Sequence, residues 1–226
     1  MLPATQVLAV RSGPHSLPVA LQDIRSVQAL TVVGVATPVT TQRTVARGLV
    51  RDALRQTLGA FLDQPAASIA LVSPPSQAIA VDAPRERLGL SVSHAPGLSL
   101  AAIAQGARVG VDVVRIENAA EAYPDWLCVA RDYLGPQATA WLQATPATDC
   151  PVAFMQAWTQ FEACLKCLGL GLTEWSPQLG AQLATCQVWA LDFGANHSGP
   201  VATDGHFIGS VAVQAPALRS VHPAQR

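Results

Sequence analysis

Apolar and polar residues recur with a helical period in two long segments of the chain. Between Thr44 and Leu62 apolar residues return near helical spacing, while arginine occupies every fourth position and so follows one face. We predict a helix over residues 44–62 with a basic stripe, a feature that is more often a solvated face than an anion site. The stripe consists of Arg43, Arg47, Arg51 and Arg55.

The second helical pattern follows Asp149 and ends at Gly169. Asp149 is a suitable N-cap, a proline at 151 fits the first turn, and glycines at 169 and 171 end the pattern. Glu162 and Lys166 lie four residues apart beside the apolar stripe, and spacing alone favours an ordinary exposed ion pair. The stripe consists of Phe154, Trp158, Phe161, Leu165 and Leu168.

Strand-like patterns fill the remaining segments. Residues 88–93 and 98–104 flank a turn-forming sequence, His94-Ala95-Pro96-Gly97, so we expect two strands with Ser93 and His94 at the tip. Residues 187–213 alternate short apolar stretches with turn residues, which indicates a closing antiparallel sheet. The predicted fold class is α+β.

Asp112 interrupts a β-branched run over residues 108–116, where a buried charge requires a partner. If folding brings Asp112 near Glu162, the two carboxylates form an oxygen-rich site suited to Mg²⁺, which binds one or two carboxylates and substrate phosphate oxygens. Lys166 then suits a phosphate or a leaving group. Ser93 and His94, by contrast, are most often hydrogen-bonding loop residues.

Composition narrows the classes of partner. The chain has 226 residues, of which 50% are hydrophobic and 13% charged, so it can bury a large core in one domain or two small ones. A net charge of −1 gives no general attraction to nucleic acid or to an anionic membrane. Five scattered cysteines favour a reducing compartment, and without a secretory signal or a membrane-length apolar run we expect a cytoplasmic protein.

Two other kinds of site fit the sequence less well than a magnesium site. A hydrolase triad of Ser93, His94 and Asp112 lacks the G-x-S-x-G elbow, and adjacent side chains in a strand point apart. Cys164 and Cys167 have the spacing of a metal or redox pair, but they lie in mid-helix without a second closely spaced ligand pair. Buried helical cysteines are the simpler interpretation.

Three motifs in order resemble one enzyme family. LSVSHAPG is followed by VGVDVVRIE and then by WTQFEACLKCLGLGL, across about residues 88 to 172. This series resembles the Sfp-type 4'-phosphopantetheinyl transferases, whose pattern is a serine-histidine after a strand, G-[IV]-D, and W-x-x-K-E-A-x-x-K-x-x-G-x-G-L. The resemblance implies two pseudo-symmetric α/β subdomains, residues 1–107 and 108–226, with the junction near Gly106 to Val109 and the active site in the cleft between them.

The same resemblance implies roles for individual residues. Asp112 and Glu162 are expected to bind magnesium, and Ser93, His94 and Arg47 to contact the phosphates of coenzyme A. Lys166 is expected to neutralise or protonate the leaving phosphate. The implied reaction is attack of a carrier-protein serine on the β-phosphate of coenzyme A, releasing 3',5'-ADP. Glu162, directly or through a water on the metal, is the candidate base.

The chain departs from the family pattern at several positions. Val114 replaces a third acidic ligand, Phe161 replaces a lysine, and Ser76-Gln77-Ala78 stands where a Gly-Lys-Pro loop is common. Fewer cations predict a raised KM for coenzyme A, with the work shifted to Arg47, Arg51 and Lys166. Glu117 has no assigned role.

These departures leave a second hypothesis open, a weakened relative that binds carrier protein or coenzyme A without efficient transfer. The partner is expected to be an apo carrier protein of acyl, peptidyl or polyketide type. Two half-domains in one chain would complete the cleft internally, so we expect a monomer that binds neither nucleic acid nor membrane.

Overall fold

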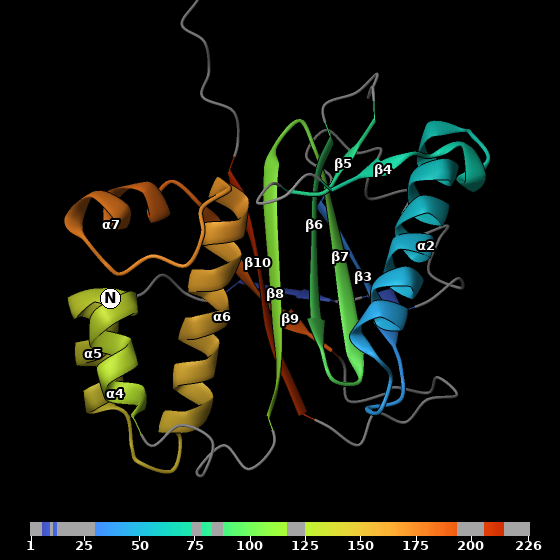
Figure 1. The fold of residues 1–226 in the computed structure, drawn as a ribbon. Helices are drawn as coiled ribbons and strands as arrows, with labels where there is room; N and C mark the ends of the chain where they lie inside the picture. Colours follow the sequence, from blue (N-terminus) through green and yellow to red (C-terminus); the bar gives the residue numbers. More distant parts are fainter. Residues whose placement is uncertain are drawn as a thin grey trace, which may run out of the picture.

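The computed structural model describes residues 6–9, 11–12, 30–73, 78–82, 88–116, 125–193 and 206–214. They form two four-stranded sheets with helices on the outside (Figure 1). The strands are β1 (Gln6–Ala9), β2 (Arg11–Ser12), β3 (Leu30–Ala36), β4 (Leu71–Val72), β5 (Ala80–Val81), β6 (Leu88–Ala95), β7 (Leu98–Gln105), β8 (Arg108–Ile116), β9 (Gln187–Asp192) and β10 (His206–Gln214). The helices are α2 (Arg43–Leu62), α4 (Trp126–Val129), α5 (Gly135–Ala144), α6 (Cys150–Leu168) and α7 (Pro177–Leu183), with short helical turns η2 (Ala66–Ser68) and η3 (Ala130–Leu134).

The two large sheets share one pattern of connection. Their strand orders are β2-β3-β7-β6 and β1-β9-β10-β8, while β4 and β5 form a separate pair. In the first sheet β7 is antiparallel to both β3 and β6, and in the second β10 is antiparallel to both β8 and β9. Each sheet therefore contains a strand, a following helix and two later strands, with the last strand between the other two. The mixed α and β architecture with antiparallel sheets agrees with the predicted class.

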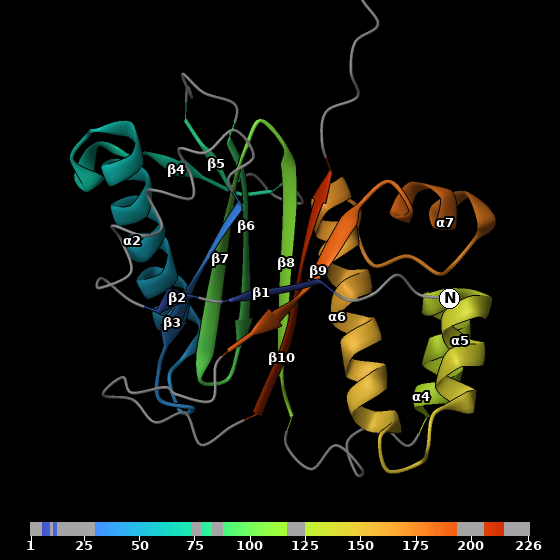
Figure 2. The same cartoon turned by 180° about the vertical axis from the view of Figure 1, so that it is seen from behind.

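The first described residues join the two sheets. Strand β1 pairs in parallel with β9 of one sheet, and β2 pairs in parallel with β3 of the other (Figure 2). A division of the chain at residue 107 therefore assigns β1 to the first half, although its hydrogen bonds are made to the second.

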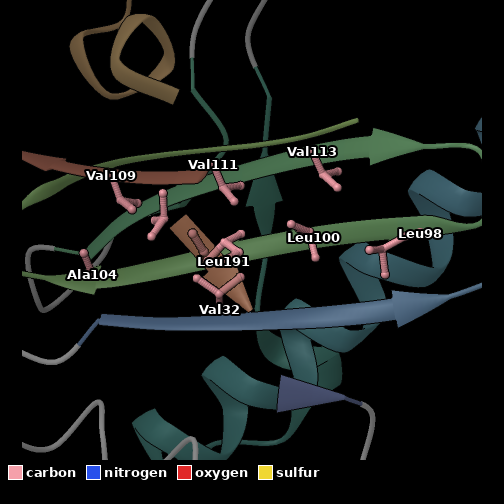
Figure 3. Packing of buried hydrophobic residues seen from close by; sticks show 10 residues of the cluster. Val32, Leu98, Leu100, Ala104, Val109, Val111, Val113 and Leu191 are labelled. Atoms are coloured by element: carbon pink, nitrogen blue, oxygen red, sulfur yellow. The ribbon is translucent and has the colours of Figure 1, made fainter. Parts of the chain in front are cut away.

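The core lies in layers between and outside the sheets. Alternate residues of β3 and β7 face β8 and β9 across the interior, as the cluster in Figure 3 shows. The opposite face of the first sheet packs against α2, while the second sheet packs against α6. Burying one valine or leucine side chain contributes about 1.5–3 kcal/mol, so these clusters hold the sheets and helices as one body. The inner cluster includes Val32, Leu98, Leu100, Ala104, Val109, Val111, Val113 and Leu191.

The two long helices occur where the sequence predicts them. Val50, Leu54 and Leu58 of α2 are fully buried against the first sheet. Helix α6 ends at Gly169 in the left-handed conformation (φ 72°), and the Leu170 amide donates to the Leu165 carbonyl at 2.9 Å. This arrangement satisfies carbonyls that the helix end leaves without partners.

Two local predictions need correction. The Asp149 side chain precedes α6 but accepts no capping bond from it. Ser93 and His94 lie inside β6 rather than at the tip of a turn, because the pairing continues to Ala95 opposite Leu98. A two-residue turn suffices there, since Gly97 adopts a positive φ of 93° that other residues rarely accept.

Among the described helices, none is both long and apolar enough to span a bilayer.

Candidate functional site

Strands β6 and β8 lie side by side, and small residues let them approach closely. A Cβ on Gly89 would lie 2.2 Å from the Ala107 carbonyl oxygen, so β6 tolerates no side chain at this position. Ser91 Oγ accepts a bond from the Val111 amide at 3.1 Å. Alternate residues of β6 thus face β8, and a hydroxyl takes the place of a backbone acceptor at this edge.

Asp112 of β8 has partners from two other elements. Its Oδ1 accepts hydrogen bonds from Ser93 Oγ at 2.8 Å and from Lys166 Nζ at 2.7 Å. The residue is only 9% exposed. The expectation that this charge requires a partner is confirmed, and both bonds go to the same oxygen, so Oδ2 takes part in neither.

Lys166 reaches across the sheet edge from α6. Its ammonium also donates to Ser93 Oγ and to the Val111 carbonyl, each at 3.2 Å. Three acceptors match the three hydrogens of an ammonium group. An ordinary exposed pair between Glu162 and Lys166 therefore does not account for this lysine, which forms an ion pair with Asp112.

Gly110 brings α6 close enough for this contact. A Cβ at position 110 would lie 2.0 Å from the Ala163 carbonyl oxygen and 2.4 Å from the Cys167 amide nitrogen. Only a hydrogen fits between β8 and the helix backbone. Gly110 thus allows α6 to pack close to β8. Asp112 lies two residues further along the same face of the strand, so it is also close to the helix.

Glu162 lies in the electrostatic field of the same group. Burial raises the pKa of its carboxyl above the usual value, the negative charge of Asp112 raises it further, and Lys166 opposes both effects. The fold therefore brings together the two carboxylates that the sequence singled out. Their mutual repulsion favours a proton or a cation between them.

His94 points to the other face of β6, as expected for adjacent residues in a strand. Its Nδ1 is 2.9 Å from Ser99 Oγ on β7. Burial, together with the positive charges of Arg47, Arg43 and Lys166, lowers the pKa of His94 to about 4. Three cations thus act on one imidazole, which is neutral at pH 7.

The arginine stripe of α2 divides into two parts. Arg43 and Arg47 are the members that act on His94. Arg51 donates to the Leu71 carbonyl and to Ser73 Oγ, both at 2.9 Å, and Arg55 pairs with Asp52 at 2.7 Å. Arg51 and Arg55 thus stabilise the structure around α2. Only Arg43 and Arg47 of the stripe contribute positive charge near His94.

A buried polar group lies beside Asp112 on the neighbouring strand. Ser210 of β10 is the cross-strand partner of Asp112 and is fully buried. Its hydroxyl accepts a bond from Gln156 Nε2 at 2.9 Å and lies 3.0 Å from Thr159 Oγ1. Sequence reasoning missed this group, because nothing in the sequence relates residues on α6 to a serine on β10.

Ser91 was also missed, although the sequence contained a signal. Gly89, Ser91 and Ser93 occupy alternate positions of an otherwise apolar strand, a pattern that indicates close approach by another strand.

The two positions that depart from the family pattern serve the core. Phe161 is 6% exposed and packs with Leu165 and Leu179, while Val114 packs against the cluster that contains Phe154. Neither side chain adds a charge to the site. Glu117, Ser76 and Gln77 lie outside the described residues.

Within the described ranges, no group of three or more His, Cys, Asp or Glu side chains is arranged to hold a metal ion.

We compared the chain with known proteins and protein families. A search of curated proteins gives no match. A family model described as the 4'-phosphopantetheinyl transferase superfamily matches residues 108–194, a segment that includes Gly110, Asp112, Glu162 and Lys166. The resemblance predicted from the sequence is thereby confirmed over residues 108–194, which are similar to the 4'-phosphopantetheinyl transferase superfamily.

Proposed function

We propose that this protein transfers 4'-phosphopantetheine from coenzyme A to a serine of an apo carrier protein and releases 3',5'-ADP. The observation that carries the proposal is the contact of Asp112 with both Lys166 and Ser93; Asp112 and Lys166 lie in the segment that matches the transferase superfamily model. Three elements that are distant in the sequence supply an acid, a cation and a hydroxyl to one point. Such convergence at a sheet edge is typical of a reaction site.

The donor chemistry at this point fits a magnesium ion. Burial raises the pKa of Glu162 and the charge of Asp112 raises it further, so a divalent cation bound by both carboxylates would relieve the repulsion. Two carboxylates are few for a metal site, but Mg²⁺ commonly takes its remaining ligands from water and substrate phosphates. When bound, magnesium supplies neutralisation of the pyrophosphate charge.

We propose that Arg47, Arg43 and His94 bind the phosphates of coenzyme A. Burial is the main cause of the lowered pKa of His94, and the positive charges that add to it would attract an anion at this position. A bound phosphate would offset the arginine charges and would accept a hydrogen bond from the imidazole. Lys166 forms an ion pair with Asp112 and acts on His94 through its charge, and we assign it to the leaving phosphate.

Glu162 is our candidate for the base that accepts the proton of the carrier serine. A raised pKa makes a carboxylate a stronger base, and half-burial beside Asp112 is the cause of the increase here. The nearby charge of Lys166 keeps the ionised form accessible. The base and the cation for the leaving group thus come from successive turns of one helix.

The repeated connection of the two sheets supports two pseudo-symmetric halves, residues 1–107 and 108–226. The order strand, helix, two strands occurs once before residue 107 and once after it. All proposed site residues come from one chain, so we propose that a monomer is sufficient. The expected cytoplasmic location rests on the sequence alone.

A second candidate function, binding without efficient transfer, is favoured by the packing of Phe161 and Val114. Both side chains belong to the core, so the site has one carboxylate and one cation fewer than the family pattern. To distinguish the two functions, the protein is incubated with apo carrier proteins of the acyl, peptidyl and polyketide types, coenzyme A and Mg²⁺, and each carrier is weighed by mass spectrometry. A gain of one phosphopantetheine supports transfer. If coenzyme A binds but no carrier gains mass, the binding function replaces it.

A further inference from the structure

Three cysteines from two separate segments of the chain form a group, two on α6 and one in the turn that precedes β9. Cys164 and Cys167 lie one helical turn apart and are 6% and 3% exposed. Cys186 is half-buried in the turn between α7 and β9 and packs against both of them. Small apolar residues complete the cluster, which includes Ala163, Ala212, Leu183 and Val188.

Ordinary packing explains only part of this cluster. A buried helical cysteine behaves as a small hydrophobic residue, which accounts for Cys164 and Cys167 taken singly. It does not account for a third cysteine, partly open to solvent, placed against them from another element. Cys164, Cys167 and Cys186 are all free thiols, so they are available for reaction with one another.

The environment favours the ionised form of one thiol. Hydrogen bonds from Cys164 and then from Cys167 lower the pKa of Cys186, and burial only partly opposes this effect. The thiolate is the nucleophilic form of cysteine, and a reactive cysteine is typically low in pKa and accessible. Cys186 has both properties, and two candidate partners lie beside it.

We propose that Cys186 is an oxidation-sensitive thiol that reacts with hydroperoxides and then forms a disulfide with Cys164 or Cys167. The Cys186 sulfur bonds to one oxygen of hydrogen peroxide as the O–O bond breaks, giving a sulfenic acid and, after protonation, one water. The helix thiol then bonds to this sulfur, and the second oxygen leaves as water with the thiol proton. Two thiols lose two electrons and two protons, and one peroxide is reduced to two waters.

The disulfide would tie the start of β9 to α6. Two sulfurs in a disulfide lie about 2.05 Å apart, closer than two thiols in contact, so the helix and the turn must move together. Glu162 and Lys166 lie on the same two turns of α6 as these cysteines. Oxidation would therefore act on the helix that carries the proposed site, although the formation of the disulfide does not depend on the proposed function.

The test uses the full chain, reduced and then exposed to a small excess of hydrogen peroxide. Free thiols are blocked with one alkylating reagent, the disulfides are reduced, and the released thiols are labelled with an isotopic form of the same reagent before peptide mapping. We expect the isotopic label on Cys186 together with Cys164 or Cys167. A disulfide that involves Cys128 or Cys150, or oxidation of Cys186 without a partner, would overturn the proposal.

Variants distinguish reactivity from damage. Cys186→Ser should abolish the disulfide, and the control Cys128→Ser, which removes an exposed cysteine elsewhere, should leave it unchanged. At pH 6 iodoacetamide should label Cys186 about tenfold faster or more than Cys128. Equal labelling rates would contradict the proposed thiolate. If Cys186→Ser lowers the melting temperature, this comparison of rates in the unaltered chain remains decisive.

Discussion

The region around α2 and the region around α6 are built alike but contribute differently to the site. Helix α2 follows β3 and helix α6 follows β8, and in each sheet the last strand, β7 or β10, pairs with that strand. Arg43 and Arg47 of α2 act on His94 through their field. Lys166 of α6, in contrast, makes direct contact with Asp112 because Gly110 removes the side chain that would hold the helix away. One connection pattern thus supports two roles: α2 contributes positive charge near His94, and α6 contributes a direct contact with Asp112.

The largest expected effect belongs to the α6 region. Asp112→Asn and Glu162→Gln should each lower the rate of transfer by about 10³-fold or more, since each removes one of the two carboxylates that we assign to the metal. The measurement is the mass gain of apo carrier protein over time at saturating coenzyme A. Asp52→Asn on α2 is the matched control, because Asp52 is exposed and pairs with Arg55. A rate near that of the parent protein for Asp112→Asn would refute the placement of the site.

A pair of glycine substitutions tests whether the close packing of α6 on β8 requires a glycine at position 110. Gly110→Ala should lower the free energy of unfolding by about 2–3 kcal/mol, because the new methyl group meets backbone atoms of α6 that have no room to move. Gly48→Ala in α2 meets nothing within 4 Å and should raise it by about 0.5–1 kcal/mol. Urea unfolding followed by circular dichroism measures both values. Equal effects of the two substitutions would remove the proposed role of Gly110.

A smaller effect is expected from the cations of α2. Arg47→Ala should raise the KM for coenzyme A about tenfold and leave kcat within about twofold, since the arginine binds a part of the substrate that does not react. Arg55→Ala is the control, because Arg55 lies on the same helix but pairs with Asp52. A fall in kcat without a change in KM would instead assign Arg47 to the chemical step. For the parent protein we expect a KM for coenzyme A above the low micromolar range.

The smallest effect tests the field of α2 directly. NMR titration should give His94 a pKa of about 4, and Arg47→Ala should raise it, because one of the charges that oppose protonation is removed. Arg55→Ala should not change it. As the pH falls from 6.5 towards 4, the unfolded chain binds a proton at this histidine and the folded chain does not, so stability decreases. His94→Gln should make that decrease shallower; an unchanged slope would mean that His94 titrates normally in the folded protein.

The fold was predictable where local patterns are strong. The period of α2 and α6, the run of β8 and the glycine after α6 each depend on neighbours in the sequence, and the structure confirms them. The tip position of Ser93 and His94 was wrong because the turn has two residues rather than four, so that His94 and Ala95 continue the strand. The Asp149 cap failed because Asp149 has helical backbone angles, whereas an N-cap residue is extended, and its carboxylate accepts a bond from Thr148 Oγ1 instead. Both errors occurred at the ends of elements, where pairing geometry outweighs residue preference.

For this protein the sequence alone determined the unusual residues: an aspartate in an apolar strand, a glutamate and a lysine on one helix, and a serine beside a histidine. These are local conflicts with burial and periodicity, and a single chain displays them. Only the tertiary structure decided that Ser93 and Lys166 share one oxygen of Asp112, that two of four arginines act on His94, and that Cys186 completes a group of three thiols. Such contacts depend on how closely strands and helices approach. That spacing is set by the packing of residues far apart in the chain.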